Sequence, residues 1–358
     1  MHICYTIELP PRSLLDCRTS QDSAYHRSTA FKVVEVMSRL IKPSDIPESL
    51  WHAETTRLHL APTLLTAWKH LLQHAGLKER ALQPAPPSIT GGLSKEATDD
   101  HLAWRFSGSS ARVQLSLLDP RDELVGVADA FAKVFSGGTV LVADLPCGSG
   151  AAVLTLLTSI AELRTQGRIP RNPLHVRVVG GELSDSARGY ASRAIDHIKE
   201  TLAEQAIWVS AEFLSWNALD KFSTAELTNR LTLLGQGCSA RLMVLANFSD
   251  FLQREGKWKE ALPQFESLFV HGRAHNSFVL WIEPQTNQVI GAGGFFGRAI
   301  VWFKKLFSAH QTKEEQEALV VENLGKSAAD VQHPLKDHQF NVHLVIQRFD
   351  LPLIGTKA

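Results

Sequence analysis

The sequence predicts an α/β protein built on a doubly wound, mostly parallel sheet. Short runs rich in Val, Ile and Leu, with little polar alternation, are typical of strands buried on both faces. They begin with "GTVLVADL" and continue with "HVRVVGGEL", "QAIWVSAEFL", "ARLMVLANF", "NSFVLWIEP" and "FNVHLVIQRFDL". Helical patterns such as "SARGYASRAIDHIKETLAEQ" lie between these runs, which predicts right-handed crossovers.

The first part of the chain has a different pattern and predicts a mainly helical accessory region over residues 1–115, before a second domain over 116–358. "STAFKVVEVMSRLI" and "APTLLTAWKHLLQHAGLKER" repeat apolar residues every three or four positions, and the second helix should stop at Ala75 and Gly76. Residues 82–100 are rich in Pro, Gly and Ser and predict a linker or exposed loop. A further helix is expected over residues 120–135.

Composition limits the possible settings and partners. The 358 residues include 37 Lys and Arg against 37 Asp and Glu, so no global field favours a polyanionic partner. The four cysteines are scattered without a Cys-x-x-Cys pair, which argues against a zinc site or a disulfide framework and favours a reducing, cytoplasmic location. We expect no membrane span and no bound metal, because no apolar run approaches the roughly 18–20 residues of a span and no ligand cluster is evident.

Functional residues are expected directly after the strands, because ligands of doubly wound sheets bind beyond the carboxyl ends of the strands. A glycine turn, "DLPCGSG", follows the first strand and would let a ligand approach the backbone. An acid after the second strand can accept both hydroxyls of a ribose, and an acid after the third can accept a purine amino group. Glu182 and Glu212 hold these two positions, and Asn247 follows the fourth strand. An adenosine-bearing ligand meets all of these requirements.

These motifs resemble those of the class I S-adenosylmethionine-dependent methyltransferases between residues 138 and 247. "DLPCGSG" resembles the family's first motif, and "VVGGELS" with the Ala-rich "ARGYASRAI" resembles its second strand and following helix. "AEFL" resembles the end of the third strand, and "FNVHLVIQRF" the closing antiparallel strand. The resemblance implies a class I methyltransferase fold and S-adenosylmethionine as the cofactor.

The resemblance also implies a role for each matched position. Gly148 and Gly150 would flank the methionine end of the cofactor, Asp144 would order the loop or the cofactor amine, and Cys147 would pack beside the ligand. Glu182 and Leu183 would hold the ribose, Glu212 and Phe213 would lie near the adenine, and Asn247 would complete the cofactor-binding set. A dinucleotide fold also uses a glycine turn and a ribose-binding acid. In this chain, however, the third glycine of the dinucleotide-binding motif is replaced by Val153. Glu182 also lies farther from the glycine turn than the offset of about 20 residues expected for the ribose-binding acid of that fold.

The methyl acceptor is less evident. The fourth strand is followed by "ANFSDF", without the prolines of the Asp/Asn-Pro-Pro-aromatic motif that amino-methylating nucleic-acid enzymes often carry. We expect Phe248 with Phe295 or Phe296 to line the opening, and part of the N-terminal region to roof it. The pairs His70/His74 and His271/His275 have metal-compatible spacing but no third ligand, and are interpreted as solvated helix faces. No catalytic base is assigned, since methyl transfer depends mainly on in-line positioning.

Three functions remain open at this point. The first is a methyltransferase acting on RNA or on a protein component of a ribonucleoprotein, which the added N-terminal region and the segments bearing Arg and Lys favour. The second is a small-molecule O- or N-methyltransferase. The third is a catalytically inactive member that serves as a scaffold or partner-binding subunit. The N-terminal region is also a possible surface for a homodimer or another protein partner.

Overall fold

The chain is described from a computed structural model, in which residues 39–86, 92–286, 295–307 and 324–353 are described. All of these residues fall within one compact unit. The predicted helix in "STAFKVVEVMSRLI" lies mostly outside the described residues.

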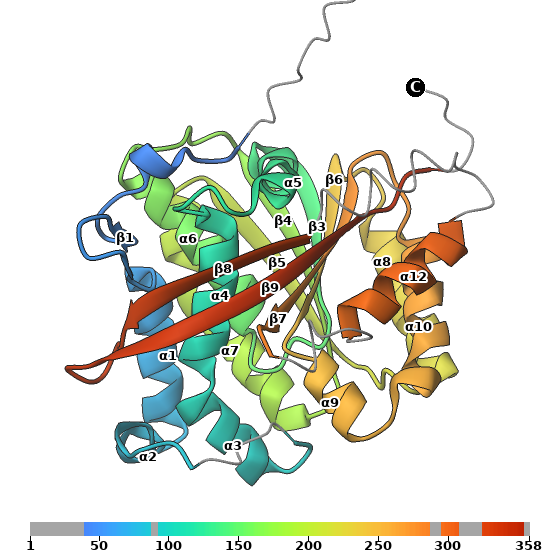
Figure 1. Cartoon of the computed structure of the whole chain (residues 1–358), viewed down its shortest axis with the longest axis horizontal. Coiled ribbons are helices and arrows are strands. Elements are labelled where there is room, and N and C mark those ends of the chain that lie inside the picture. The colour runs from blue at the N-terminus through green and yellow to red at the C-terminus, as the bar shows by residue number, and fades with distance from the viewer. Residues whose placement is uncertain (1–38, 87–91, 287–294, 308–323, 354–358) are drawn as a thin grey trace, which may run out of the picture. The chain divides into compact units, whose positions relative to one another are not determined.

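A single sheet organises the described part of the chain (Figure 1). Its strand order is β1-β2-β8-β9-β7-β6-β3-β4-β5. The strands are β1 (Trp51–His52), β2 (Arg57–Leu58), β3 (Gly138–Asp144), β4 (Leu174–Glu182), β5 (Ile207–Ser215), β6 (Ala240–Ala246), β7 (Ser277–Pro284), β8 (Leu324–Gln332) and β9 (Gln339–Asp350). All six strands predicted from apolar runs are present.

The connectivity of this sheet is that of the class I methyltransferase fold. The chain starts at the central strand β3 and moves outward through β4 and β5, with β4 parallel to both neighbours. It then crosses to the other side of β3 to add β6 and β7, again in parallel. Strand β9 is antiparallel and lies between β7 and β8. The predicted fold class and the closing antiparallel strand are therefore confirmed.

Helices cover both faces of the sheet, and each face has its own apolar cluster. The first face carries α1 (Pro62–His74), α4 (Phe106–Leu118), α5 (Val125–Phe135), α6 (Ala151–Thr165) and α7 (Asp185–Glu204). The second carries α8 (Lys221–Leu234), α9 (Ser249–Arg254), α10 (Trp258–His271) and α12 (Phe295–Phe307). Among the described helices, none combines the length and apolarity needed to cross a membrane.

Three local predictions need correction. Residues 82–100 are not a continuous loop. Helix α2 (Lys78–Leu82) ends at the start of this segment, and the short helix α3 (Lys95–Trp104) begins inside it. The Ser94 side chain caps α3 by accepting a hydrogen bond from Ala97 N. The helix expected from residue 120 begins only at Val125, because Asp119 and Asp122 have left-handed backbone angles. The spacing of His271 and His275 is not helical either, because α10 ends at His271.

The sequence patterns missed strand β8. Its buried positions alternate as a half-buried strand requires, but they are occupied by Gly325, Ser327 and Ala329, with Val331 as the one larger apolar side chain. Gly325 is required there, because a Cβ atom would lie 2.4 Å from the Leu124 side chain. A strand whose inner residues are this small has no apolar run that a sequence reading can recognise.

Helix α12 is a covering helix of the second face. Ala299 and Phe303 are buried in its apolar cluster. The Phe303 ring lies 4.3 Å from that of Phe349 on β9, measured between ring centroids. Part of the apolar face of α12 therefore packs on the sheet.

A buried ion-pair network ties α5 to β9, and it predicts a large effect of one substitution. Arg348 is 6% exposed and bonds Asp129, Asp350 and the Gly126 carbonyl. We expect Arg348→Leu to lower the free energy of unfolding by about 3–5 kcal/mol, because it leaves buried polar partners uncompensated. Lys133, 45% exposed, pairs with the same Asp129, so Lys133→Leu should cost at most about 1 kcal/mol. Urea unfolding of both variants measures the difference, and equal losses would contradict this account of the network.

Candidate functional site

The glycine turn after β3 is fixed by backbone hydrogen bonds to neighbouring strands. Leu145 N donates to Val244 O on β6 at 2.9 Å, and Cys147 N donates to Gly181 O on β4 at 3.0 Å. Gly150 N then closes the turn on Cys147 O at 2.8 Å, and α6 begins at the next residue. The turn is therefore held at the carboxyl ends of β4 and β6, where a ligand of this fold is expected.

The two glycines of this turn have different roles. Both have positive φ angles, 51° at Gly148 and 82° at Gly150, which favour glycine. A Cβ atom on Gly148 would have no atom within 4 Å, so this glycine borders open space. A Cβ atom on Gly150 would lie 3.1 Å from the Ala191 Cβ, so this glycine lets α6 and α7 pack closely. Of the pair predicted to bind the cofactor, Gly148 is the one that leaves an accessible backbone.

Glu182 connects this turn to the end of β4. Its carboxylate accepts from Gly148 N at 3.2 Å through Oε2 and from Ser184 N at 2.9 Å through Oε1. The next residue, Leu183, is 38% exposed although it is apolar. The structure thus brings together Gly148, Glu182 and Leu183, as the sequence predicted for one ligand site.

Asp144 lies beneath the turn and is fully buried. Its Oδ2 accepts from Val153 N in the first turn of α6 at 3.2 Å, whereas Oδ1 has no partner in the described part of the chain. Burial raises the pKa of this carboxyl to about 7, and the nearby Glu182 adds to the shift. A buried polar atom without a partner at this place is compatible with a ligand cation or a water molecule.

Cys147 and Phe213 form the wall between the turn and β5. A Cβ atom on Gly180 would lie 2.9 Å from the Cys147 Sγ and 2.4 Å from the Phe213 ring, so both side chains cover that glycine. Burial raises the pKa of the Cys147 thiol well above its ordinary value, and the neighbouring carboxylates act in the same direction. Cys147 is therefore a packing residue rather than a thiolate nucleophile.

The placement of Glu212 at the end of the third predicted strand is wrong. Strand β5 continues to Ser215, which pairs with Glu182. Glu212 lies inside the strand and forms an ion pair with Arg230 of α8, which lowers the pKa of Glu212. The first residues beyond the strand are Trp216 and Asn217, and the Asn217 Oδ1 accepts from Leu219 N at 3.0 Å. The place of Glu212 near an adenine stays a prediction, and Asn217 is a polar residue that lies beyond the strand end.

Asn247 follows β6 and meets a side chain from the N-terminal region. It has a left-handed φ of 57°, and its Oδ1 accepts from the Arg112 Nε of α4 at 2.9 Å. Glu283, fully buried near the end of β7, holds the adjacent turn by accepting from Phe248 N at 3.0 Å and Ser249 N at 2.8 Å. Burial raises the pKa of Glu283 to about 7. This carboxyl positions Asn247 and its neighbours.

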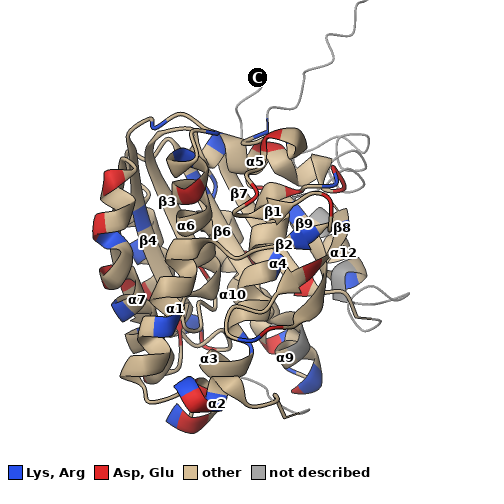
Figure 2. Cartoon of the chain, turned by 90° about the vertical axis from the view of Figure 1, so that its left-hand side faces the viewer, with Lys and Arg blue, Asp and Glu red and all other residues tan. Residues whose placement is uncertain are grey.

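Helices α3 and α4 cross the carboxyl end of β3. At one end, Thr98 of α3 lies 2.8 Å from Ser184 after β4, between hydroxyl oxygens, and at the other end Arg112 reaches Asn247 after β6. These two contacts join the α3–α4 pair to the residues that follow β4 and β6, the strands on either side of β3. Figures 1 and 2 both place α3 and α9 at the lower end of the molecule.

The residues proposed for the acceptor are only partly described. The Phe248 ring stacks on Phe251 with 5.5 Å between centroids and meets Phe265 edge-on at 6.3 Å, so it packs toward α10. Phe295 and Phe296 begin α12, but their side chains lie outside the described part of the structure, as does the loop 291–294.

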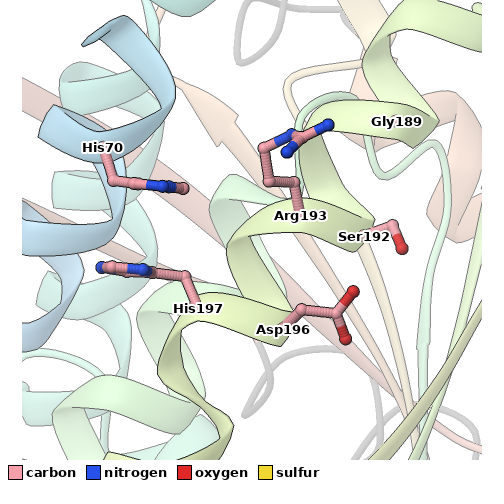
Figure 3. A pocket seen from close by; sticks show the side chains of 6 residues that line it. All are labelled: His70, Gly189, Ser192, Arg193, Asp196 and His197. Atoms are coloured by element: carbon pink, nitrogen blue, oxygen red, sulfur yellow. The ribbon is translucent and has the colours of Figure 1, made fainter. Parts of the chain in front are cut away.

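A separate hollow of about 470 Å³ lies between α1 and α7 (Figure 3). His70 and His197 stack there with ring centroids 4.1 Å apart, so His70 is a packing residue and not simply a solvated one. Arg193 and Asp196 also line the hollow. It contains none of the residues at the strand ends, and is distinct from the candidate site.

The sequence patterns did not reveal Arg112 or the role of Glu283. Arg112 and Asn247 are 135 positions apart, so no local motif links them. One sequence feature could have indicated Glu283: like Asp144, it is an acidic residue at the end of a predicted buried strand.

Comparison of the sequence with models of known protein families and with curated proteins finds no match. Similar solved structures include a Listeria monocytogenes protein assigned to the class I S-adenosylmethionine-dependent methyltransferases, at 13% identity and a TM-score of 0.32, with 82% of each chain covered. A Leishmania major S-adenosylmethionine-dependent methyltransferase matches at 14% identity and a TM-score of 0.25, covering 72% of this chain and 87% of that one. A loganic acid methyltransferase in complex with SAH matches at 10% identity and 0.27, covering 68% and 93%. At these values the fold assignment rests on the chain's own strand order.

The raised pKa of Asp144 predicts a pH dependence of stability. A carboxyl that titrates near pH 7 when folded and near 4 when unfolded binds its proton more tightly in the folded state. It therefore makes the free energy of unfolding fall as the pH rises from about 4 to about 7, by up to about 1.4 kcal/mol per unit. We expect Asp144→Asn to show a shallower fall than wild type in urea unfolding between pH 5 and 8.

The matched control is Asp196→Asn, whose side chain is 62% exposed and hydrated in both states. This control should reproduce the wild-type pH dependence. An Asp144→Asn profile parallel to wild type would show that Asp144 titrates normally.

Proposed function

We propose that this chain is an S-adenosylmethionine-dependent methyltransferase whose cofactor site is formed by the glycine turn after β3 and by Glu182 at the end of β4. The observation that carries this proposal is the Glu182 carboxylate, which is bonded to Gly148 N while the Cβ position of Gly148 faces open space, with the exposed Leu183 next in the chain. The class I connectivity of the sheet supports the same site.

The residues present fit this cofactor. The oxygens of Glu182 retain acceptor capacity beyond their two backbone partners, which suits the two hydroxyls of a ribose. The unpartnered Oδ1 of Asp144 suits a cationic amine, which would also favour the ionised form of that carboxyl. Leu183, Cys147 and Phe213 supply apolar surface. Gly148 allows a ligand to approach the backbone.

When bound, S-adenosylmethionine supplies a methyl group on a positively charged sulfur. The chain's own contribution is positional: the glycine turn and Glu182 fix the donor side, and Asn247 with the α3–α4 pair borders the acceptor side. Alignment of donor and acceptor within about 3–3.5 Å accounts for much of such catalysis. The α3–α4 pair would also shield the crevice from water, which extends the proposal to a substrate role for the region over residues 1–115.

The acceptor class is open between RNA or a ribonucleoprotein component and a small molecule. In the view of Figure 2, positive and negative residues are mixed over α7 and α2, so the described residues on that side offer no support for an RNA-binding stripe. A scaffold function is the second candidate, because Glu182 already has two backbone partners without a ligand. We also propose that the N-terminal region binds a second copy of the chain or another protein. The proposed location of the protein is cytoplasmic.

The proposal predicts that the purified protein binds S-adenosylmethionine and S-adenosylhomocysteine, and that Glu182→Ala weakens both. The expected loss is about 1–3 kcal/mol, because hydrogen bonds to a charged group are removed. Isothermal titration calorimetry measures this loss directly. Glu200 is an exposed acidic residue on α7, the helix that follows Glu182. The control variant Glu200→Ala should therefore leave the affinity for both ligands unchanged.

Two results separate the candidates. Absence of binding at millimolar ligand in the wild type would contradict the cofactor site altogether. Binding without methyl transfer to cellular RNA, protein or metabolite fractions would favour the scaffold.

A further inference from the structure

Three basic or potentially basic side chains form a cluster on α3 and α4, namely His101, Arg105 and Arg112. Arg105 lies at the junction of the two helices, and the three side chains are close enough that Arg105 and Arg112 both act electrostatically on His101, and Arg105 acts on Arg112. The two helices are nearly continuous, with a break at Arg105. The Leu102 carbonyl next to this break accepts from the Trp68 Nε1 at 2.9 Å, so the bend is fixed by packing with α1.

Most hydrogen-bond donors of this cluster have no partner. Arg112 donates to Asn247 through Nε, and neither of its Nη atoms bonds another described residue. Arg105 is half-buried, and its side chain makes no hydrogen bond or ion pair within the described part of the chain. The pKa of Arg112 is lowered to about 10, first by burial and then by Arg105, with Glu283 opposing. The pKa of His101 is lowered to about 4, mainly by burial, so this imidazole is neutral.

Gly108 leaves space between the two arginines. It lies three residues after Arg105 and four before Arg112. The one atom within 4 Å of the position of a Gly108 Cβ is the Arg112 Nη1, at 3.9 Å. The Arg112 guanidinium therefore folds back over this glycine toward Arg105, and a side chain at residue 108 would occupy the space between them.

The location of this cluster relates it to methyl transfer. It lies between the Thr98–Ser184 contact and the Arg112–Asn247 hydrogen bond, which join α3 and α4 to the residues that follow β4 and β6. The carboxylates of Asp144 and Glu182 belong to the β3–β4 side of the crevice, whereas the guanidinium groups belong to the β6 side. Glu283, a buried carboxyl that acts electrostatically on Arg112, also lies on the β6–β7 side.

We propose that Arg105 and Arg112 bind an oxyanion, a carboxylate or phosphate group, on a small methyl acceptor. His101 borders the same site as a neutral hydrogen-bonding group. Guanidinium groups suit this task, since they present several donors to a planar or tetrahedral oxyanion. Both arginines are half-buried rather than fully exposed, which favours a small acceptor, because the nucleic-acid backbone is contacted by surface-lying basic residues. This inference rests on the proposed function.

The test uses the full-length protein saturated with S-adenosylhomocysteine and titrated with inorganic phosphate as the probe. We expect Arg105→Gln and Arg112→Lys each to weaken phosphate binding by at least about 10-fold, as expected for loss of a charge-assisted hydrogen bond. Arg105→Gln removes a side chain without a partner, so it should fold as wild type does. Arg193→Gln, an exposed arginine on α7, is the matched control and should retain wild-type affinity.

Three outcomes would overturn the inference. The first is phosphate affinity unchanged in both variants. The second is loss of S-adenosylhomocysteine affinity in the variants with methylthioadenosine affinity retained, because the arginines would then hold the cofactor's own carboxylate. The third is tighter binding of a single-stranded RNA oligonucleotide than of phosphate, with the same dependence on Arg105.

Failure of the proposed function gives a different result. In that case the wild type would bind phosphate through Arg105 and Arg112 but would show no heat with S-adenosylhomocysteine. The two arginines would then form an anion-binding site that does not serve a methyl acceptor.

Discussion

The hydrogen bonds of the Glu182 carboxylate are the contacts on which the geometry of the candidate site depends. Through Gly148 N and Ser184 N, one side chain links the turn after β3 to the start of α7. Ser184 in turn caps α7 and contacts Thr98 of α3. The position of the roof helices, the opening beside Gly148 and the exposure of Leu183 all follow from this connection. A ligand with a hydroxyl pair would meet an acceptor that the backbone already holds in place.

Two buried carboxyls support the carboxyl edge of the sheet in the same manner. Asp144 binds the backbone of α6 through Val153, and Glu283 binds the backbone at the start of α9 through Phe248 and Ser249. Each has one oxygen without a partner among the described residues, and burial raises the pKa of each to about 7. The edge is thus built from groups whose charge responds to a nearby cation. This property suits a ligand that carries positive charge on the side of Asp144, whereas Glu283 lies near Arg112 on the β6–β7 side.

Local chemistry explains which parts could be predicted. Asp144, Gly148 and Glu182 belong to short motifs whose turn geometry is encoded nearby, and the six apolar runs predicted six strands. Glu212 was misplaced because "AEFL" resembles the residues that end a third strand in the family, whereas pairing with β4 extends β5 to Ser215. Strand β8 was missed because its inner residues are small. Arg112 was not predictable, since its partner Asn247 comes from a distant part of the chain and tertiary packing alone unites them.

A crystal structure of the protein with S-adenosylhomocysteine tests the central claim most directly. The account predicts that the ribose hydroxyls bind Glu182, with the ligand beside Gly148 and Leu183 and beneath α3 and α4. A ligand bound instead in the hollow lined by His70 and His197, or bound with the Glu182 carboxylate turned away from it, would contradict the account.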